Sequence, residues 1–165
     1  MGKKGNLRET VVFAFSEEEV LRELTVECAY VAKSMAGAAD LKTGWSHAVI
    51  VSDDDRPFVS RWLSDARDEM THALSAYLSG EYASTESDVV FAVVLPQERA
   101  RGLDESICHQ LERAIVHYIL SQWFVTKLPE ESARRQLQYQ GALSTVKSDI
   151  RLACNRRPHR PTNYF

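Results

Sequence analysis

The sequence predicts a mainly α protein with a four-helix core, a long C-terminal antiparallel helical hairpin, a small two-stranded β element and an extended C-terminal arm. Apolar residues recur at spacings of three and four over long stretches, and helix-starting residues stand before most of them. Near the end, Pro158 and Pro161 together exclude a helix. We therefore expect one helical domain over residues 1–154 and a basic arm over residues 155–165.

The size and composition suit a single globular domain. The chain has 165 residues, of which 44% are hydrophobic and 26% charged, and its net charge is -3. This balance excludes global disorder and gives no sign of a general nucleic-acid binder. The three cysteines are far apart and form no Cys-x-x-Cys pair, which indicates a reducing intracellular setting rather than disulfides or zinc. The longest apolar run, residues 89–95, is too short to cross a membrane.

The first predicted elements are a strand and a helix in direct succession. β-branched and aromatic side chains predict a strand over residues 10–15. Ser16 and Glu19 then have the spacing of a capping box, which predicts a helix from residue 17 to about residue 35. Its core face is expected to hold Val20, Leu24, Cys28, Val31 and Met35. Residues 38–52 stay undecided between a loop and a short strand.

A second helix is predicted after three aspartates. Asp53, Asp54 and Asp55 offer N-cap oxygens, and Pro57 suits a first helical turn. Gly80 is expected to end the helix. The predicted core stripe consists of Phe58, Trp62, Ala66, Met70, Ala73 and Tyr77, widened by Leu63, Leu74 and Leu78.

The next predicted elements are a second strand and a third helix. Residues 89–95 resemble the first strand in character and end at Pro96, so the two strands can pair as a ribbon. The third helix is expected to begin near Asp104, with Leu103 as a hydrophobic staple. Its core face is predicted to hold Ile107, Leu111, Ala114, Ile115, Tyr118, Ile119, Gln122 and Trp123.

A fourth helix is predicted to begin at Pro129. Because its link to the third helix is very short, we expect the two helices to form an antiparallel hairpin. Its predicted core residues are Tyr139, Leu143, Val146, Ile150 and Ala153. Its predicted exposed side holds Arg134, Arg135, Gln136, Gln138 and Gln140.

The sequence contains none of the usual motifs of catalytic or metal-binding sites. The glycines are scattered, so no phosphate-binding loop is formed. His109 and His117 lie eight residues apart on one helix, too far to share a zinc ion, and Cys108 beside His109 points in a different direction. The three aspartates are read as helix caps rather than metal ligands. We expect no catalytic residue, no metal and no cofactor.

The basic arm is the segment whose composition favours a binding role. Arginines seek carboxylates or phosphates, prolines reduce the entropy lost on ordering, and terminal aromatic residues are common anchors. A solvated tail, a contact with a neighbouring subunit and a contact with a nucleic-acid backbone stay open on composition alone. The candidate binding residues are Arg156, Arg157, His159, Arg160, Tyr164 and Phe165.

The chain resembles the small helical head–tail connector proteins (adaptor or neck proteins) of tailed bacteriophages, of the type found in phages and prophages of Bacteroides-like bacteria. Residues 114–124 and 128–131 carry the resemblance, with Tyr139 and the ending in Arg156-Arg157-Pro158 and Phe165. The opening strand that leads into Ser16 and the strand-like residues 89–95 fit the same layout. The pattern covers most of the chain without a diagnostic motif.

The resemblance implies a structural protein of the virion neck that is assembled in the bacterial cytoplasm. Such connectors form a ring, typically twelvefold, between the portal and the tail. The ring extends the channel through which genomic DNA passes without specific binding, and it offers a docking surface to tail proteins. By the same resemblance, the C-terminal arm would contact the portal protein or a neighbouring subunit.

Two other classes of function remain open at this point. A small nucleic-acid-associated regulatory protein could use the basic arm, although the fourth helix carries only scattered arginines for reading bases. An enzyme with a site shared between subunits would draw on Asp53 to Asp55 and His47, and it would bind divalent metal ions. Salt-sensitive DNA binding would favour the former class and metal binding the latter.

Overall fold

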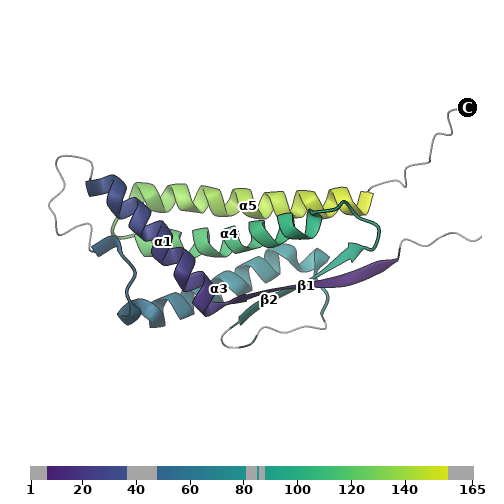
Figure 1. Ribbon diagram of the computed structural model, residues 1–165, viewed down its shortest axis with the longest axis horizontal. Helices are drawn as coiled ribbons and strands as arrows, with labels where there is room; N and C mark the ends of the chain where they lie inside the picture. Colours follow the sequence, from purple (N-terminus) through teal and green to yellow (C-terminus); the bar gives the residue numbers. More distant parts are fainter. Residues whose placement is uncertain (1–6, 37–47, 81–84, 86–87, 156–165) are drawn as a thin grey trace, which may run out of the picture.

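The computed structural model describes residues 7–36, 48–80, 85 and 88–155 (Figure 1). Helices account for 73% of this part of the chain, which also holds a small two-stranded antiparallel sheet, as predicted. The strands are β1 (Arg8–Ser16) and β2 (Asp88–Pro96), and the helices are α1 (Glu17–Ala36), α3 (Arg56–Leu74), α4 (Leu103–Phe124) and α5 (Pro129–Asn155), with short 3-10 turns at Asp53–Asp55 and Ser75–Tyr77. No described helix could span a membrane.

The two predicted strands pair with each other. β1 and β2 are antiparallel, with Phe13 opposite Phe91 and Phe15 opposite Val89. These four side chains are buried and point toward the helices, and the rings of Phe15 and Phe91 lie 6.4 Å apart. A two-stranded sheet is marginal alone, so the helix layer on this face is what stabilises it.

The start of α1 is fixed by the predicted capping box. The backbone N–H of Ser16 donates to Glu19 Oε2 at 3.2 Å, and the N–H of Glu19 donates to Ser16 Oγ at 3.3 Å. Two amides that the first turn leaves without a helical partner are thereby satisfied. The chain passes from the last residue of β1 directly into α1, and the predicted helix is confirmed.

The core stripe of α3 matches most of the predicted stripe, but it begins at Val59 rather than at Phe58. Val59 is fully buried, whereas Phe58 is 57% exposed and packs only against Trp62 among the aromatic residues described, at 6.1 Å. The buried residues are Val59, Leu63, Ala66, Met70 and Leu74. Leu63, Ala66, Met70 and Leu74 were all predicted to be buried. The choice between Phe58 and Val59 depended on where α4 and β2 lie, which periodicity does not give. The helix also ends at Leu74, before the predicted Gly80.

The aspartates before α3 act differently from the predicted simple caps. Asp55 Oδ2 accepts hydrogen bonds from Ser52 N–H at 2.9 Å and from Ser52 Oγ at 2.7 Å. Asp55 stands at the N-cap position of α3, but its side chain makes no cap bond to that helix. The capping interaction therefore closes the short turn before the helix rather than α3 itself.

α4 and α5 lie side by side along the length of the molecule, while α1 crosses them and α3 and the strands lie on the other side of α4 (Figure 1). All five predicted core residues of α5 are buried. α4 is buried on more sides than predicted because α1, α3 and α5 all contact it. Val116, His117, Leu120 and Phe124 are buried in addition to the predicted residues, whereas Tyr118 and Gln122 are only partly buried.

Candidate functional site

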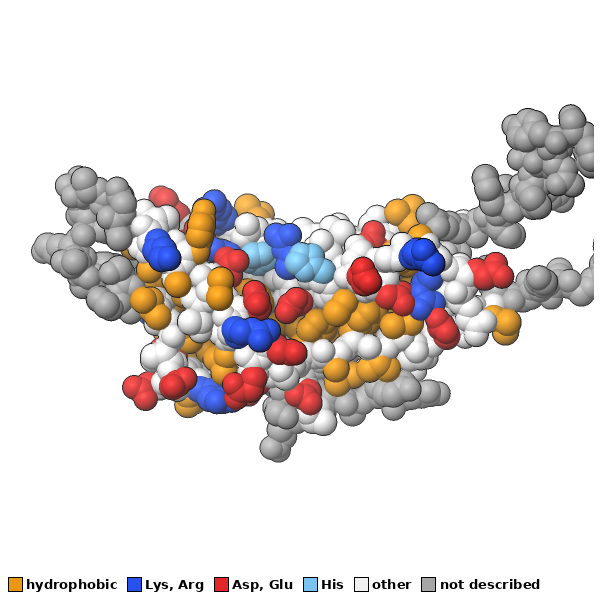
Figure 2. All heavy atoms as spheres, in the orientation of Figure 1, with side chains coloured by type: hydrophobic (Ala, Val, Ile, Leu, Met, Phe, Trp, Pro, Cys, Tyr) orange, Lys and Arg blue, Asp and Glu red, His pale blue; other side chains and the backbone are white. Residues whose placement is uncertain are grey.

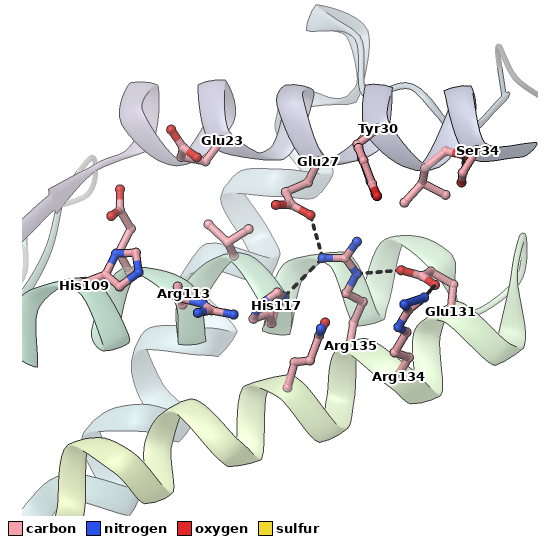
Figure 3. Close-up of a pocket in the computed structure, with 14 residues that line it drawn as sticks. Glu23, Glu27, Tyr30, Ser34, His109, Arg113, His117, Glu131, Arg134 and Arg135 are labelled. Carbon is pink, nitrogen blue, oxygen red and sulfur yellow. Dashed lines mark hydrogen bonds and ion pairs between the residues drawn. The ribbon is translucent and has the colours of Figure 1, made fainter. Parts of the chain in front are cut away.

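A polar groove of about 530 Å³ lies between α1, α4 and α5 (Figure 3). Acidic, basic and imidazole side chains from the three helices converge on it. Its lining residues are Glu23, Glu27, Tyr30, Val31, Ser34, His109, Glu112, Arg113, Val116, His117, Glu131, Arg134, Arg135 and Gln138. On the face of the molecule drawn in Figure 2, charged side chains of both signs are intermixed over this region, and hydrophobic ones gather between α4 and β1.

Arg135 forms the floor of the groove. The prediction that this residue is exposed is wrong, because only 6% of its surface is accessible. Its Nη1 donates to Glu27 Oε2 at 2.7 Å, and its Nε donates to Glu131 Oε1 at 2.8 Å. Figure 3 shows the guanidinium reaching from α5 toward α1. A buried cation requires such partners, since its desolvation would otherwise cost several kcal/mol.

His117 lies beside this ion pair as a neutral ring. Its Nδ1 is 3.4 Å from Arg135 Nη1. Because arginine can only donate, Nδ1 is assigned as the acceptor and the ring proton as lying on Nε2. Burial, followed by the positive charges of Arg135 and Arg113, lowers the pKa of His117 to about 4, although Glu27 and Glu131 oppose the shift. Proton exchange near neutral pH is therefore not available to this histidine.

The buried histidine makes stability depend on pH. In the unfolded chain His117 is protonated below about pH 6.5, whereas in the folded chain it is protonated only below about pH 4. The free energy of unfolding should therefore fall as the pH is lowered from 6.5 to 4. The slope from this group reaches about 1.4 kcal/mol per pH unit. Urea unfolding at several pH values measures it, and His117→Gln should show a smaller decrease than the wild-type chain. Equal slopes would contradict the assignment of a neutral, buried ring.

The remaining groups in the groove suit binding rather than covalent chemistry. Gln138 Oε1 is buried and has no hydrogen-bond partner among the described residues. Glu23, Glu112 and Arg113 line the groove around the central ion pair. None of the lining residues is a cysteine, and its one serine, Ser34, donates to the carbonyl of Val31. The groove can hold a polar segment but offers no activated nucleophile.

The cysteines of the chain are free thiols, as expected. Cys28 is fully buried, and burial raises its pKa to about 12, while Cys108 and Cys154 are partly buried. Burial also raises the pKa of Cys108. A raised pKa disfavours the reactive thiolate, so Cys28 and Cys108 are poor nucleophiles.

The sequence-predicted binding residues lie outside the described residues. They are Arg156, Arg157, His159, Arg160, Tyr164 and Phe165. The alternative metal site at Asp53 to Asp55 involved His47, which is also outside the described part. Among the described residues, no group of three or more histidine, cysteine, aspartate or glutamate side chains could hold a metal ion.

The burial of Arg135 could have been predicted from the sequence. Arg135 precedes Tyr139 by four residues, and both lie on the stripe that continues through Leu143 and Val146. Glu131 stands four residues before Arg135, at the spacing of an ion pair within a helix. Extending the core stripe by one turn would have predicted a buried arginine. Glu27, its partner from α1, could not be identified because it is 108 residues away in sequence.

A second candidate surface is the outer face of α5. Residues 136–146 contain no charged side chain, and Leu137 and Leu152 are largely exposed on the solvent side. Gly141 lies between them on this face, in the middle of the helix. A Cβ atom added there would meet nothing within 4 Å. The fold of a single chain therefore does not require glycine, which costs about 1 kcal/mol relative to alanine in a helix.

Comparisons of the chain with protein-family models, with curated proteins and with solved structures give no match.

Proposed function

We propose that the protein is a structural, non-enzymatic subunit of a ring in the head–tail connector of a tailed bacteriophage. In this proposal the ring, twelvefold in the assembled particle, lies between portal and tail, extends the DNA channel and provides a docking surface. The antiparallel hairpin of α4 and α5 would be the rigid body of each subunit. The mildly acidic chain, with its net charge of -3, suits a channel along which DNA must slide without sticking.

The outer face of α5 is the observation that carries this proposal. Leu137 is exposed on the uncharged stretch of α5 over residues 136–146, and Leu152 is exposed further along the same helix. Gly141 would allow a neighbouring helix to approach α5 closely. Such a contact would explain why glycine stands at a position where the fold of a single chain does not require it. A ring needs such a contact, in which one surface of a subunit meets a different surface of the next.

The basic arm and the groove supply the remaining contacts in this proposal. Arg156, Arg157 and Arg160 would bind carboxylates of the portal or of a neighbouring subunit, with His159 beside them, and Tyr164 and Phe165 would act as anchors. The groove, with the buried ion pair at its floor and the charged side chains around it, would receive a polar segment of another neck or tail protein.

Assembly should therefore fail when either contact is altered while the fold is retained. Deletion of residues 155–165 is expected to leave the helical circular dichroism unchanged and to abolish ring assembly, since every buried stripe precedes the deleted segment. Assembly is measured by mass photometry of the chain with the portal-like protein of the same genome. Normal assembly of the truncated chain would refute the role given to the arm.

Gly141→Leu tests the α5 face in the same assay. It should raise the free energy of unfolding of the single chain by about 0.5–1 kcal/mol, because leucine is the better helix former, and yet it should block assembly. Gly80→Leu is the matched control, since a Cβ atom at Gly80 also meets nothing within 4 Å and this residue lies off α5. A Gly141→Leu chain that assembles as well as the control would contradict the proposed contact. Loss of assembly combined with tight, salt-sensitive binding to duplex DNA would favour a regulatory nucleic-acid-binding protein instead.

A further inference from the structure

The outer edge of β1 carries backbone groups that point away from the rest of the molecule. Leu7 O accepts a hydrogen bond from Gln97 N–H at 2.9 Å, in line with the register that pairs Arg8 with Pro96. In an antiparallel pair, the backbone N–H and C=O of one residue bond to the partner strand, and those of the next residue point away from it. The odd-numbered residues of β1 therefore bond to β2. The backbone N–H and C=O groups of Thr10, Val12 and Ala14 point away from β2.

The two edges of the sheet differ. On the outer edge of β2, Ala92 O accepts a hydrogen bond from Ser79 N–H at 2.7 Å, and Leu78 forms a bridge to Val93. On the outer edge of β1, the described residues provide no backbone partner for Thr10, Val12 or Ala14, and all three are exposed. Within the described part of the chain, β1 is therefore the open edge of the sheet, over a strand of nine residues.

This open edge lacks the usual protection against strand pairing. Natural edge strands are shielded by prolines, lysines, bulges or short length. The residues between Glu9 and Glu17 include no charged residue and no proline. The residues whose backbone groups lie on the open edge are Thr10, Val12 and Ala14. Val12 is 44% exposed. A long, uncharged, β-branched edge of this kind favours addition of another strand.

We infer that β1 pairs with β1 of a second copy of the chain, antiparallel and about a two-fold axis at Val12. In this register Val12 faces Val12 of the second copy, and Thr10 faces its Ala14. Every outward N–H and C=O of these residues then has a partner, and the two small sheets become one continuous four-stranded sheet.

The charges at the two ends of β1 favour a second copy over an unrelated strand. Arg8 lies at one end of the outward face and makes no ion pair among the described residues. Asp88 lies at the other end, opposite Ser16 on β2, and Glu18, which pairs with Arg56 of its own chain, lies near it. An antiparallel pair brings Arg8 of each copy to the acidic end of the other, so the strand is complementary to itself. An extended partner of another protein would need to reproduce this pattern.

The pairing concerns the free chain and does not depend on the proposed ring. A two-fold contact joins identical surfaces, whereas a cyclic ring repeats a contact between different surfaces. The pair uses β1, and the proposed ring contact uses the outer face of α5. Substitutions in β1 therefore test the pair alone.

Cysteine cross-linking tests the register directly. In a chain with Cys108→Ser and Cys154→Ser, Val12→Cys should be linked to itself by a short bismaleimide, because facing Cα atoms lie about 5.5 Å apart in such a pair. Thr10→Cys alone and Ala14→Cys alone should link poorly, since each is about 14 Å from its own copy. Mixing these two chains should restore the link. Cross-linking of Ala14→Cys alone as efficient as that of Val12→Cys would overturn the register.

The oligomeric state tests the pairing itself. The wild-type chain should be dimeric by analytical ultracentrifugation at micromolar concentration, and Val12→Lys should weaken the dimer at least tenfold because two like charges would face each other. Val12→Thr, which keeps a β-branched side chain, should leave it intact. Circular dichroism checks that all three chains are folded. A monomeric wild-type chain, or a dimer that Val12→Lys leaves unchanged, would exclude the inference.

Discussion

Replacing Arg135 with alanine is expected to lower the free energy of unfolding by about 3 kcal/mol. The substitution leaves Glu27 and Glu131 at the floor of the groove without their shared cation. It also removes the hydrogen bond to His117. Both carboxylates keep some contact with solvent, so the effect belongs at the lower end of the range for a broken buried ion pair. Urea unfolding at neutral pH, followed by circular dichroism, measures the loss.

Arg134→Ala is the matched control for this prediction. Arg134 is adjacent in sequence, but its side chain is 69% exposed, and its one ion pair among the described residues is with Glu131, at 3.3 Å. Exposed pairs of this kind contribute less than about 1 kcal/mol. If the two substitutions cost the same, Arg135 would not be the buried centre of the groove.

Phe91→Ala is expected to cost about 3–5 kcal/mol, the usual range for removing a buried aromatic ring. Phe91 is fully buried on β2 and contacts Phe15 across the sheet, so the cavity would open between the sheet and the helix layer. The same equilibrium unfolding measurement applies. The exposed backbone edge of β1 would not be altered directly.

Phe58→Ala provides the comparison, with the same atoms removed at an exposed position. It should cost less than about 1 kcal/mol, since Phe58 loses mainly its contact with Trp62. Comparable losses at the two positions would mean that the core stripe of α3 includes Phe58, as its periodicity alone suggested.

Local signals accounted for most of the secondary structure. The capping box of Ser16 and Glu19 involves residues three apart, so the start of α1 could be predicted from the sequence alone. The five predicted core residues of α5 are buried for a similar reason, because one regular stripe extends along the helix. The pairing of the two strands was predicted from their matching character.

Features that depend on distant partners were not predicted. Whether Phe58 or Val59 faces the core depends on how α3 packs against α4 and β2. The burial of Arg135 depends on Glu27 from α1, and the neutral state of His117 depends on Arg135. Polar residues are predicted to be exposed by default, and only the assembled helices show that these two line the base of a groove.

Mass photometry of the purified chain, alone and mixed with the portal-like protein encoded in the same genome, tests the central claim most directly. A subunit of the connector ring should add to the portal assembly in many copies and form a discrete complex, with the Gly141→Leu chain failing to do so. A portal that gains no mass, beside a chain that instead binds duplex DNA at physiological salt, would contradict the account.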